Sequence, residues 1–199
     1  MKLKKLFVRS QNLLFNPSSE FNLIKEEESN VTGITKSYTL PIALLVGIFA
    51  LLGSAFSNMS LPINSFLYII INALIVFFLI ISHVYVSGKA ISLLGKNICP
   101  EDRSKRYYAL SAYSQLPFFL ILAFIKLFPS LIFMVFLGFY SAWLFYTGSS
   151  NMTRIPSDKR VQFTILSILI MVVIFILFSE LFTLLYSEII DQLSSFTVY

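Results

Sequence analysis

Residues 107–148 read YYALSAYSQLPFFLILAFIKLFPSLIFMVFLGFYSAWLFYTG and decide the fold of this chain. They form two apolar runs of roughly 20 residues each, the length that a helix needs to cross about 30 Å of hydrocarbon. Only a short break, from Lys126 to Pro129, separates the two runs. The sequence therefore predicts a tight hairpin of two transmembrane helices.

The first arm of this hairpin carries a polar cluster, Tyr113-Ser114-Gln115, followed by Pro117. Proline removes one backbone hydrogen bond of a helix and frees the carbonyl about one turn earlier, near Tyr113. In a membrane the freed group must be satisfied by neighbouring helices or by water that lines a cavity. This cluster is the first candidate for a structural or functional site.

The rest of the chain is also apolar enough for a membrane. Hydrophobic residues make up 57% of the 199 residues and charged residues 13%, and the mean hydropathy is +0.81. A soluble surface cannot be built from this composition. The predicted fold is all-α, a polytopic membrane helix bundle of five transmembrane helices preceded by one or two short amphipathic helices. The spans are expected at about 38–56, 64–86, 107–127, 129–148 and 161–182.

The basic N-terminal stretch MKLKKLFVRSQNLLFN has no long apolar run and no small-residue cleavage site, so it is expected to stay in the mature protein. Its leucines and Phe7 fall broadly on one side of a helical wheel, with Arg9 and Asn12 opposite or flanking. This pattern is typical of a helix that lies among lipid headgroups. Asn16-Pro17 ends this helix and can start a second one, which ends in an acidic run, residues 26–28, expected to be solvated.

Basic residues indicate the orientation of the spans. With five spans the connections alternate between two sides, and 14 of the 15 Lys and Arg residues fall on the side of the N-terminus, whereas Lys126 alone falls on the other. Because positive charge is enriched on the cytoplasmic side, the N-terminus is expected inside and the C-terminus outside. The chain is then divided into a cytoplasmic or interfacial segment, a five-span domain and a short external tail, at residues 1–36, 37–187 and 188–199.

Aromatic residues near the expected inner ends of the spans agree with this orientation. Tyr and Trp gather at the level of the headgroups in membrane proteins. The predicted aromatic belt consists of Tyr38, Tyr85, Tyr107, Tyr108, Trp143 and Tyr146.

Few ionisable or polar side chains lie inside the predicted spans. His83 is one turn from the inner end of the second span and is interpreted as an interfacial residue. Lys126 and Glu180 lie near the outer ends of the third and fifth spans, where either snorkelling or mutual pairing lowers the cost of the charge. Asn72 and Gln115 are candidates for interhelical hydrogen bonds that lock the bundle.

The sequence carries no recognised catalytic motif. The single cysteine, Cys99, excludes a disulfide within the chain, and one histidine is too few for the usual four Cys and His ligands of structural zinc. A serine elbow and a two-histidine zinc motif are missing, and Gly95-Lys96 lacks the glycine spacing of a phosphate-binding loop. The protein is therefore not expected to be an enzyme, and neither a cofactor, a metal nor nucleic acid is expected as a ligand.

A series of short motifs follows in a fixed order along nearly the whole chain: Asn16-Pro17 with Glu20-Phe21 and Ile24, Tyr38 with Pro41, Tyr113-Ser114 with Pro117, and Pro156-Ser157-Asp158-Lys159. This order resembles the bacterial branch of the Yip (Ypt-interacting protein) family of five-span membrane proteins. Eukaryotic relatives have a cytosolic N-terminus, associate with Rab GTPases and act in vesicle traffic. Their long N-terminal domain and Asp-Leu-Tyr-Gly-Pro signature do not occur in this sequence. The resemblance therefore implies a bacterial inner-membrane protein with protein partners on its cytoplasmic face, and does not imply Rab binding.

Two functional hypotheses follow. The first is a non-enzymatic membrane scaffold that binds partners through its basic inner connections and N-terminal helix. The alternative is a small transporter or channel with a polar path at the Pro117 kink; lipid handling between the leaflets is a third possibility. The scarcity of charge deep in the spans favours the scaffold. The candidate structural or interaction residues are Asn72, Tyr113, Ser114, Gln115, Pro117, Lys126 and Glu180.

Overall fold

A computed structural model describes residues 3–27, 30–57, 65–100 and 104–196, and in these ranges the regular structure is entirely helical. Five of the helical segments are long and apolar enough to cross a membrane. They are Val31–Ser57, Phe66–Ile98, Ser104–Leu127, Pro129–Met152 and Ser157–Gln192. The prediction of an all-α membrane bundle with five candidate spans after short N-terminal helices is confirmed.

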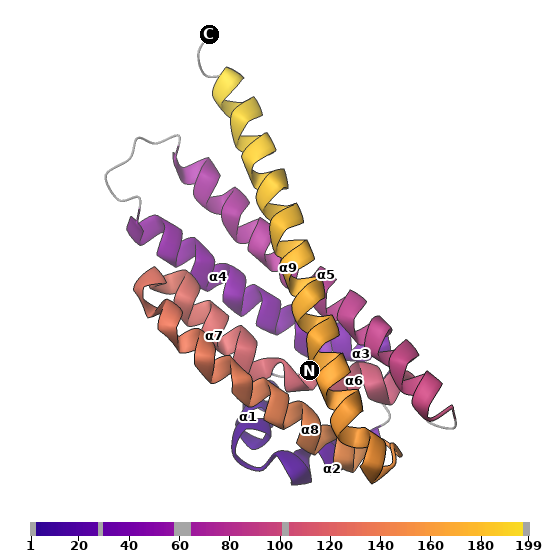
Figure 1. Ribbon diagram of the computed structural model, residues 1–199. Coiled ribbons are helices and arrows are strands. Elements are labelled where there is room, and N and C mark those ends of the chain that lie inside the picture. The colour runs from indigo at the N-terminus through magenta and orange to yellow at the C-terminus, as the bar shows by residue number, and fades with distance from the viewer. Residues whose placement is uncertain (1–2, 28–29, 58–64, 101–103, 197–199) are drawn as a thin grey trace.

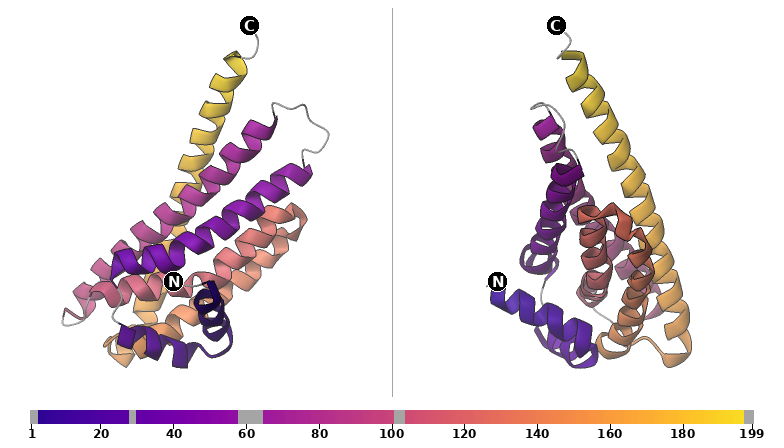
Figure 2. Two further views of the ribbon diagram at one scale, coloured as in Figure 1. Left: turned by 180° about the vertical axis from the view of Figure 1, so that it is seen from behind. Right: turned by 90° about the vertical axis from the view of Figure 1, so that its left-hand side faces the viewer.

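Two short helices precede the spans: α1 (Leu3–Phe15) and α2 (Pro17–Glu27). They contact each other and form a helical hairpin, hereafter the N-terminal hairpin. Pro17 occupies the first position of α2, where its missing N–H costs little because the first helical N–H groups have no partner within the helix. The hairpin lies at one end of the bundle, and the C-terminal end of α9 (Ser157–Phe196) lies at the opposite end (Figures 1 and 2).

The first span is built of three consecutive helical pieces: α3 (Val31–Ile34), the π-helical turn η1 (Thr35–Thr39) and α4 (Leu40–Ser57). The helix thus begins before the predicted start at residue 38. Pro41 explains the π-helical turn, since its ring would clash with the carbonyl four residues earlier, and a wider turn removes that contact.

The second span, α5 (Ser65–Ile98), continues well past its predicted end at Val86. Gly88 and Gly95 lie on its buried face, where a Cβ would come within 2.5 Å of the Tyr108 ring and 2.4 Å of the Tyr107 ring. The two glycines therefore allow the rings to pack directly against the α5 backbone. Membrane thickness gave the predicted end of the span, but this packing extends the helix beyond it.

The transmembrane hairpin has the predicted position but more pieces than expected. Its first arm consists of α6 (Ser104–Ser114) and α7 (Leu116–Leu127), separated at Gln115. Its second arm starts as a 3₁₀-helix, η2 (Pro129–Phe139), and continues as α8 (Tyr140–Met152). Side chains three residues apart eclipse in a 3₁₀-helix, and the rings of Phe136 and Phe139 accordingly stack with centroids 6.5 Å apart.

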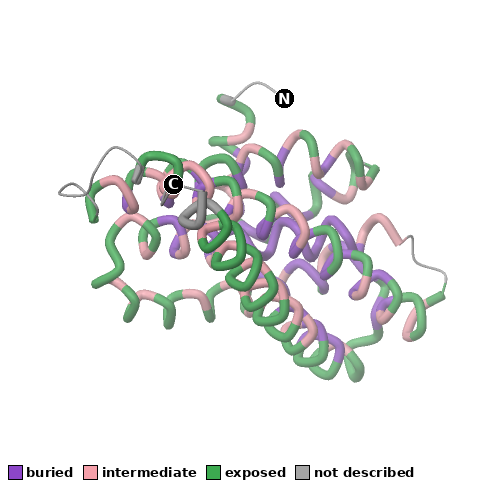
Figure 3. Tube along the Cα trace, turned by 90° about the horizontal axis from the view of Figure 1, so that it is seen from above, coloured by how far each residue is buried: buried purple, intermediate pink, exposed green. Residues whose placement is uncertain are grey.

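The core lies where α4 packs on α5 and α7, and where α5 packs on α6 and α9. Figure 3 shows the buried residues gathered in the interior and the exposed ones along the outer turns. The third candidate span is the most enclosed, with 72% of its apolar window buried. The other four spans present most of their apolar side chains to the outside, as expected for helices that face lipid.

The predicted aromatic belt is correct in part. Tyr85, Trp143 and Tyr146 are exposed. Tyr38, Tyr107 and Tyr108 are buried in the core and do not face the headgroups. The prediction was wrong for these three because position along a span says nothing about which side of the helix faces the bundle.

Candidate functional site

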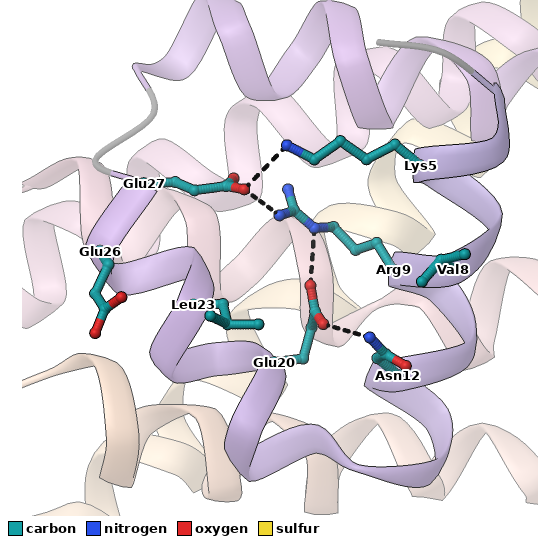
Figure 4. Close-up of a pocket in the computed structure, with 8 residues that line it drawn as sticks. All are labelled: Lys5, Val8, Arg9, Asn12, Glu20, Leu23, Glu26 and Glu27. Carbon is teal, nitrogen blue, oxygen red and sulfur yellow. Dashed lines mark hydrogen bonds and ion pairs between the residues drawn. The ribbon is translucent and has the colours of Figure 1, made fainter.

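The N-terminal hairpin is attached to the bundle through Arg9, whose side chain is only 6% exposed. Its Nε donates to Glu20 Oε1 at 3.0 Å and its Nη2 donates to Glu27 Oε1 at 2.6 Å. Lys5 adds a second donor to Glu27, at 3.2 Å, and Asn12 donates to Glu20 Oε2 at 2.9 Å. The hairpin thus holds two carboxylates and two cations in one network (Figure 4).

Arg9 also reaches the transmembrane core. Its Nη1 donates to the Tyr113 hydroxyl at 3.3 Å, and its guanidinium carbon lies 5.6 Å from the centre of the Tyr113 ring. Tyr113 is buried and packs against Tyr38 of the first span, with ring centroids 4.2 Å apart. Arg9, Glu20, Glu27 and Tyr113, hereafter the latch, therefore connect the N-terminal hairpin to the third span.

Electrostatics within the latch favour the charged forms. Burial alone would lower the pKa of Arg9, but its hydrogen bonds to Glu27 and Glu20 and the nearby negative charge together raise that pKa above its ordinary value. The hydrogen bond from Arg9 lowers the pKa of the Glu27 carboxyl, against the opposing effect of burial. A guanidinium remains charged in proteins, so the latch is an ion-paired structure at neutral pH.

These contacts correct one prediction. Arg9 was expected on the polar face of an interfacial helix, yet it points into the protein because α2 supplies carboxylates that neutralise it. Residues 26–28 were expected to be solvated, and Glu26 and Glu27 are both exposed. Glu27 is in addition ion-paired with Arg9 and Lys5, and residue 28 lies outside the described residues.

Three contacts with α8 also hold the hairpin. Lys25 Nζ donates to the Asn151 carbonyl at 3.0 Å, and the Tyr140 hydroxyl donates to the Leu14 carbonyl at 2.6 Å. Phe21 is fully buried, and a Cβ on Gly148 would come within 2.8 Å of its ring. Gly148 therefore permits close packing of α2 on α8.

A second polar group, hereafter the polar layer, lies beside the break between α6 and α7. It consists of His83 and Ser87 on α5 and Ser111 and Gln115 on the third span. The Gln115 amide nitrogen lies 3.0 Å from the Ser111 carbonyl, 3.2 Å from the Ser111 hydroxyl and 3.4 Å from the Ser87 hydroxyl. The Gln115 side-chain oxygen contacts His83 Nε2. Gln115 thus joins two spans, as predicted for an interhelical hydrogen-bonding residue.

His83 was interpreted as an interfacial residue, and the structure corrects this. It is 1% exposed and packs edge-on against the rings of Phe119 and Phe175. Its Nδ1 is buried and has no hydrogen-bond partner in the part of the chain that the structure describes. The interpretation failed because α5 extends beyond the predicted inner end of the span, which places His83 inside the bundle.

Two backbone N–H groups beside the Pro117 break have protein partners. The Phe118 N–H lies in the first turn of α7, where it has no carbonyl of its own helix to bind, and it donates to the Ser141 hydroxyl of α8 at 3.1 Å. The Phe119 N–H donates to the Gln115 carbonyl at 3.1 Å. Ser114 bonds within its own helix, to the Ser111 carbonyl. Protein groups therefore bind these two donors at the break.

The remaining candidates lie at the other end of the bundle. Asn72 Nδ2 donates to the Ser54 hydroxyl at 2.8 Å and so links α5 to α4. Lys126 and Asn72 line one pocket between the spans. Glu180 is exposed on α9, and the described residues include no ion pair between it and Lys126. The structure thus brings Tyr113–Pro117 together in one place and Asn72 and Lys126 in another, and it does not bring Glu180 to either.

Sequence reasoning did not find the latch. Glu20 was noted only as part of the short motif that follows Asn16-Pro17. The usable signal was a pair of opposite charges, Arg9 and Glu20, on the two sides of a predicted helix–proline–helix turn. Such a turn brings residues at these positions together on facing helices. That Tyr113 completes the latch required the fold, because 104 residues separate it from Arg9.

The chemistry of these two sites is that of structural attachment. The acid and base groups of the latch neutralise each other, and among the described residues there is no group of three or more His, Cys, Asp or Glu side chains that could hold a metal ion. The fold and the site define a helical membrane protein with five candidate spans, whose N-terminal helices are fixed to its third span by a buried ion-paired arginine.

The sequence profile of the Yip1 domain matches residues 12–179, and the chain belongs to the Yip1 domain family. The match runs from α1 into α9 and includes Glu20, Glu27 and Tyr113 of the latch. Comparison with curated proteins and with solved structures gave no match.

Proposed function

We propose that this protein is a non-enzymatic membrane scaffold of the bacterial branch of the family, located in the inner membrane with its N-terminus in the cytoplasm and its C-terminus outside. The bias of Lys and Arg toward the connections on the N-terminal side supports this orientation. The partners are proteins that bind at the cytoplasmic face. A Rab-type GTPase is not proposed as a partner of this protein, because the sequence lacks the Asp-Leu-Tyr-Gly-Pro signature.

The latch is the observation that carries the proposal. It holds the N-terminal hairpin in a fixed place, so that the hairpin presents a defined surface instead of a loose tail. Three apolar side chains of this surface are exposed: Phe7 at 65%, Phe15 at 78% and Leu23 at 52%. Exposed apolar residues beside charged ones are typical of surfaces that bind a partner or a membrane.

The polar layer supports a scaffold over a transport path. The Gln115 amide binds protein groups on two spans, and the Phe118 N–H beside the Pro117 break is bonded to Ser141 of α8. Residues that satisfy one another in this way stabilise a bundle. A conduit would instead need polar groups that face a hydrated cavity.

Site-specific photocrosslinking in native membranes tests the scaffold. A photoreactive amino acid at Phe7 or Phe15 is expected to give discrete protein adducts, identified by mass spectrometry. The matched control is Leu184, which is equally exposed (66%) but lies on α9 toward the opposite end. The Arg9→Met substitution should reduce the adducts at Phe15. Adducts with lipid alone, or the same adducts from Leu184, would contradict the proposal.

A further inference from the structure

A pocket of about 460 Å³ opens between the spans at the end of the bundle away from the N-terminal hairpin. Its walls come from α4, α5, α7, η2 and α9. It is distinct from the latch and the polar layer and shares no residue with either. The lining residues are Ala50, Gly53, Ser54, Ser57, Asn72, Val76, Leu79, Leu122, Ile125, Lys126, Pro129, Ile132, Phe175 and Ser179.

The polarity of this lining changes with depth. The helices α4, α7 and α9 run toward this end of the bundle and α5 starts from it (Figures 1 and 2). Along each of these four helices the polar lining residues therefore lie nearer that end of the bundle than the apolar ones: Ser54, Ser57, Asn72, Lys126 and Ser179. The apolar lining residues deeper along the same helices are Ala50, Val76, Leu79, Leu122 and Phe175.

Lys126 is the only cationic residue among the described lining residues, and carboxylates are absent from that lining. It forms no ion pair with the described residues, and Glu180 does not line the pocket. A lysine in a membrane span is costly unless a counter-charge or water accompanies it. The pocket therefore offers a positive charge that the described part of the protein does not neutralise.

Gly53 fixes the place of this lysine. A Cβ on Gly53 would lie 1.9 Å from the Lys126 carbonyl oxygen and 2.9 Å from the Leu127 Cα, so only glycine permits this approach of α4 to α7. The backbone at Lys126 is thereby held against the outer part of α4, close to Ser54. The charge is built into the pocket wall and does not lie on a free loop.

We propose that this pocket binds an anionic phospholipid of the surrounding bilayer. The phosphate pairs with the Lys126 ammonium at the mouth and lies near the hydroxyl and amide groups of Ser57 and Asn72, and the first methylene groups of the chains enter the apolar depth. A volume of about 460 Å³ falls within the usual range for ligand sites, about 300–1,000 Å³, and accommodates this part of a lipid. The rest of the chains lie along η2, which has no buried residue.

The gradient of polarity selects a lipid over a soluble anion. A phospholipid carries its charge at the membrane surface and its hydrocarbon deeper, the same order as the lining of the pocket. A free phosphate would use Lys126 but leave the half-buried Leu122, Ile125 and Phe175 uncovered. Burial of apolar surface favours the ligand that covers these side chains.

The test measures lipid-dependent melting of the purified protein in a neutral detergent, followed by the fluorescence of Trp143, the single tryptophan. Dioleoyl phosphatidylglycerol is expected to raise the melting temperature in a saturable way, and dioleoyl phosphatidylcholine is not. Lys126→Gln should weaken phosphatidylglycerol binding by at least about ten-fold, since it removes a charge-assisted contact. Lys126→Arg should retain it, because the charge is kept.

Two further variants keep the outcome interpretable. Lys159→Gln removes the same charge from an exposed residue outside the pocket and should bind like the native protein. Leu122→Phe keeps the charge of Lys126 and leaves Trp143 the single tryptophan but fills the apolar depth, and it should weaken binding as strongly as Lys126→Gln. Equal binding of both lipids, native-like binding by both pocket variants, or an equal effect of soluble glycerol phosphate would overturn the proposal.

Discussion

At the scale of single residues, attachment of the N-terminal hairpin depends on Arg9 more than on any other ionisable side chain described. It is buried, it contacts two carboxylates, and it alone joins them to Tyr113. Removal of one partner from a buried ion pair leaves an uncompensated charge, which costs far more than the pair itself contributes. Loss of Arg9 should therefore weaken docking of the hairpin far more than loss of the exposed Lys5.

Arg9→Met, which keeps the length of the side chain, is expected to leave Glu20 buried without its cation. The cost should be about 3–5 kcal/mol, up to the full docking free energy of the hairpin. Hydrogen exchange of the α1 and α2 amides measures this opening. Lys5→Met is the control, because Lys5 is 61% exposed and its ion pair should contribute about 0–1 kcal/mol. Equal loss of protection in both variants would show that Arg9 has no special place in docking.

The carboxylate of Glu27 makes docking of the hairpin sensitive to acid. Its pKa in the folded protein is lowered from the ordinary value of 4.5, so its stabilising contribution is complete above that value and is lost as the pH falls through the folded pKa. Docking should therefore be constant from neutral pH to about pH 5 and weaken below. Amide protection in α1, measured across this range, should lose most of this acid dependence in Glu27→Gln; an unchanged profile would place its origin elsewhere.

At the scale of the secondary-structure elements, the break between α6 and α7 is the feature closest to the prediction. Pro117 was expected to interrupt the third span, and the helix is interrupted at Gln115. The partners at the break came from the fold: Ser141 on α8 binds the Phe118 N–H, and His83 and Ser87 on α5 contact the Gln115 side chain. A kink follows from local chemistry, but its closure depends on segments distant in sequence.

Closure of this break by protein groups predicts that water does not reach it. In a Cys99→Ser background, Ser114→Cys and Gln115→Cys should resist small methanethiosulfonate reagents from both sides of the membrane. Ser157→Cys, at an exposed position, should react readily. Gln115→Leu should destabilise the bundle by about 1–2 kcal/mol, because its bonds to two spans are lost. Reaction at 114 or 115 would favour the transporter over the scaffold.

Hydropathy predicted the number of spans but not the helix types or all of the helix ends within them. Five apolar runs were enough to predict five spans, because burial in lipid requires length and hydrophobicity alone. The π-helical turn before Pro41, the 3₁₀-helix η2 and the extension of α5 to Ile98 were not predicted. Each depends on a local clash or on a packing partner, such as Tyr108 against Gly88, that hydropathy does not contain.

At the scale of the whole molecule, the distribution of basic residues predicts the orientation. In a Cys99→Ser background, Ser195→Cys should be labelled by an impermeant thiol reagent applied to intact spheroplasts. Ser157→Cys, at the first residue of α9, should be protected until the membrane is opened. The opposite pattern of labelling would invert the topology and place the N-terminal hairpin outside.

The candidate site was predicted less completely than the fold. Tyr113, Gln115 and Pro117 were identified because polar residues and proline are unusual in a span. Arg9 was assigned to the polar face of an interfacial helix because basic residues near a terminus usually lie there. A buried ion pair becomes visible only when the partners meet, and here they lie on two helices and a distant span.

The latch also has a thermodynamic consequence. Because Arg9 belongs to the hairpin and Tyr113 to the bundle, docking of the hairpin and packing of the bundle are thermodynamically coupled. A partner that binds only the docked hairpin must then stabilise the folded bundle by mass action, by about 2.7 kcal/mol at a hundred times its dissociation constant. Occupancy of the N-terminal hairpin would thus be readable from the melting of the membrane-embedded part, even though the partner never touches it.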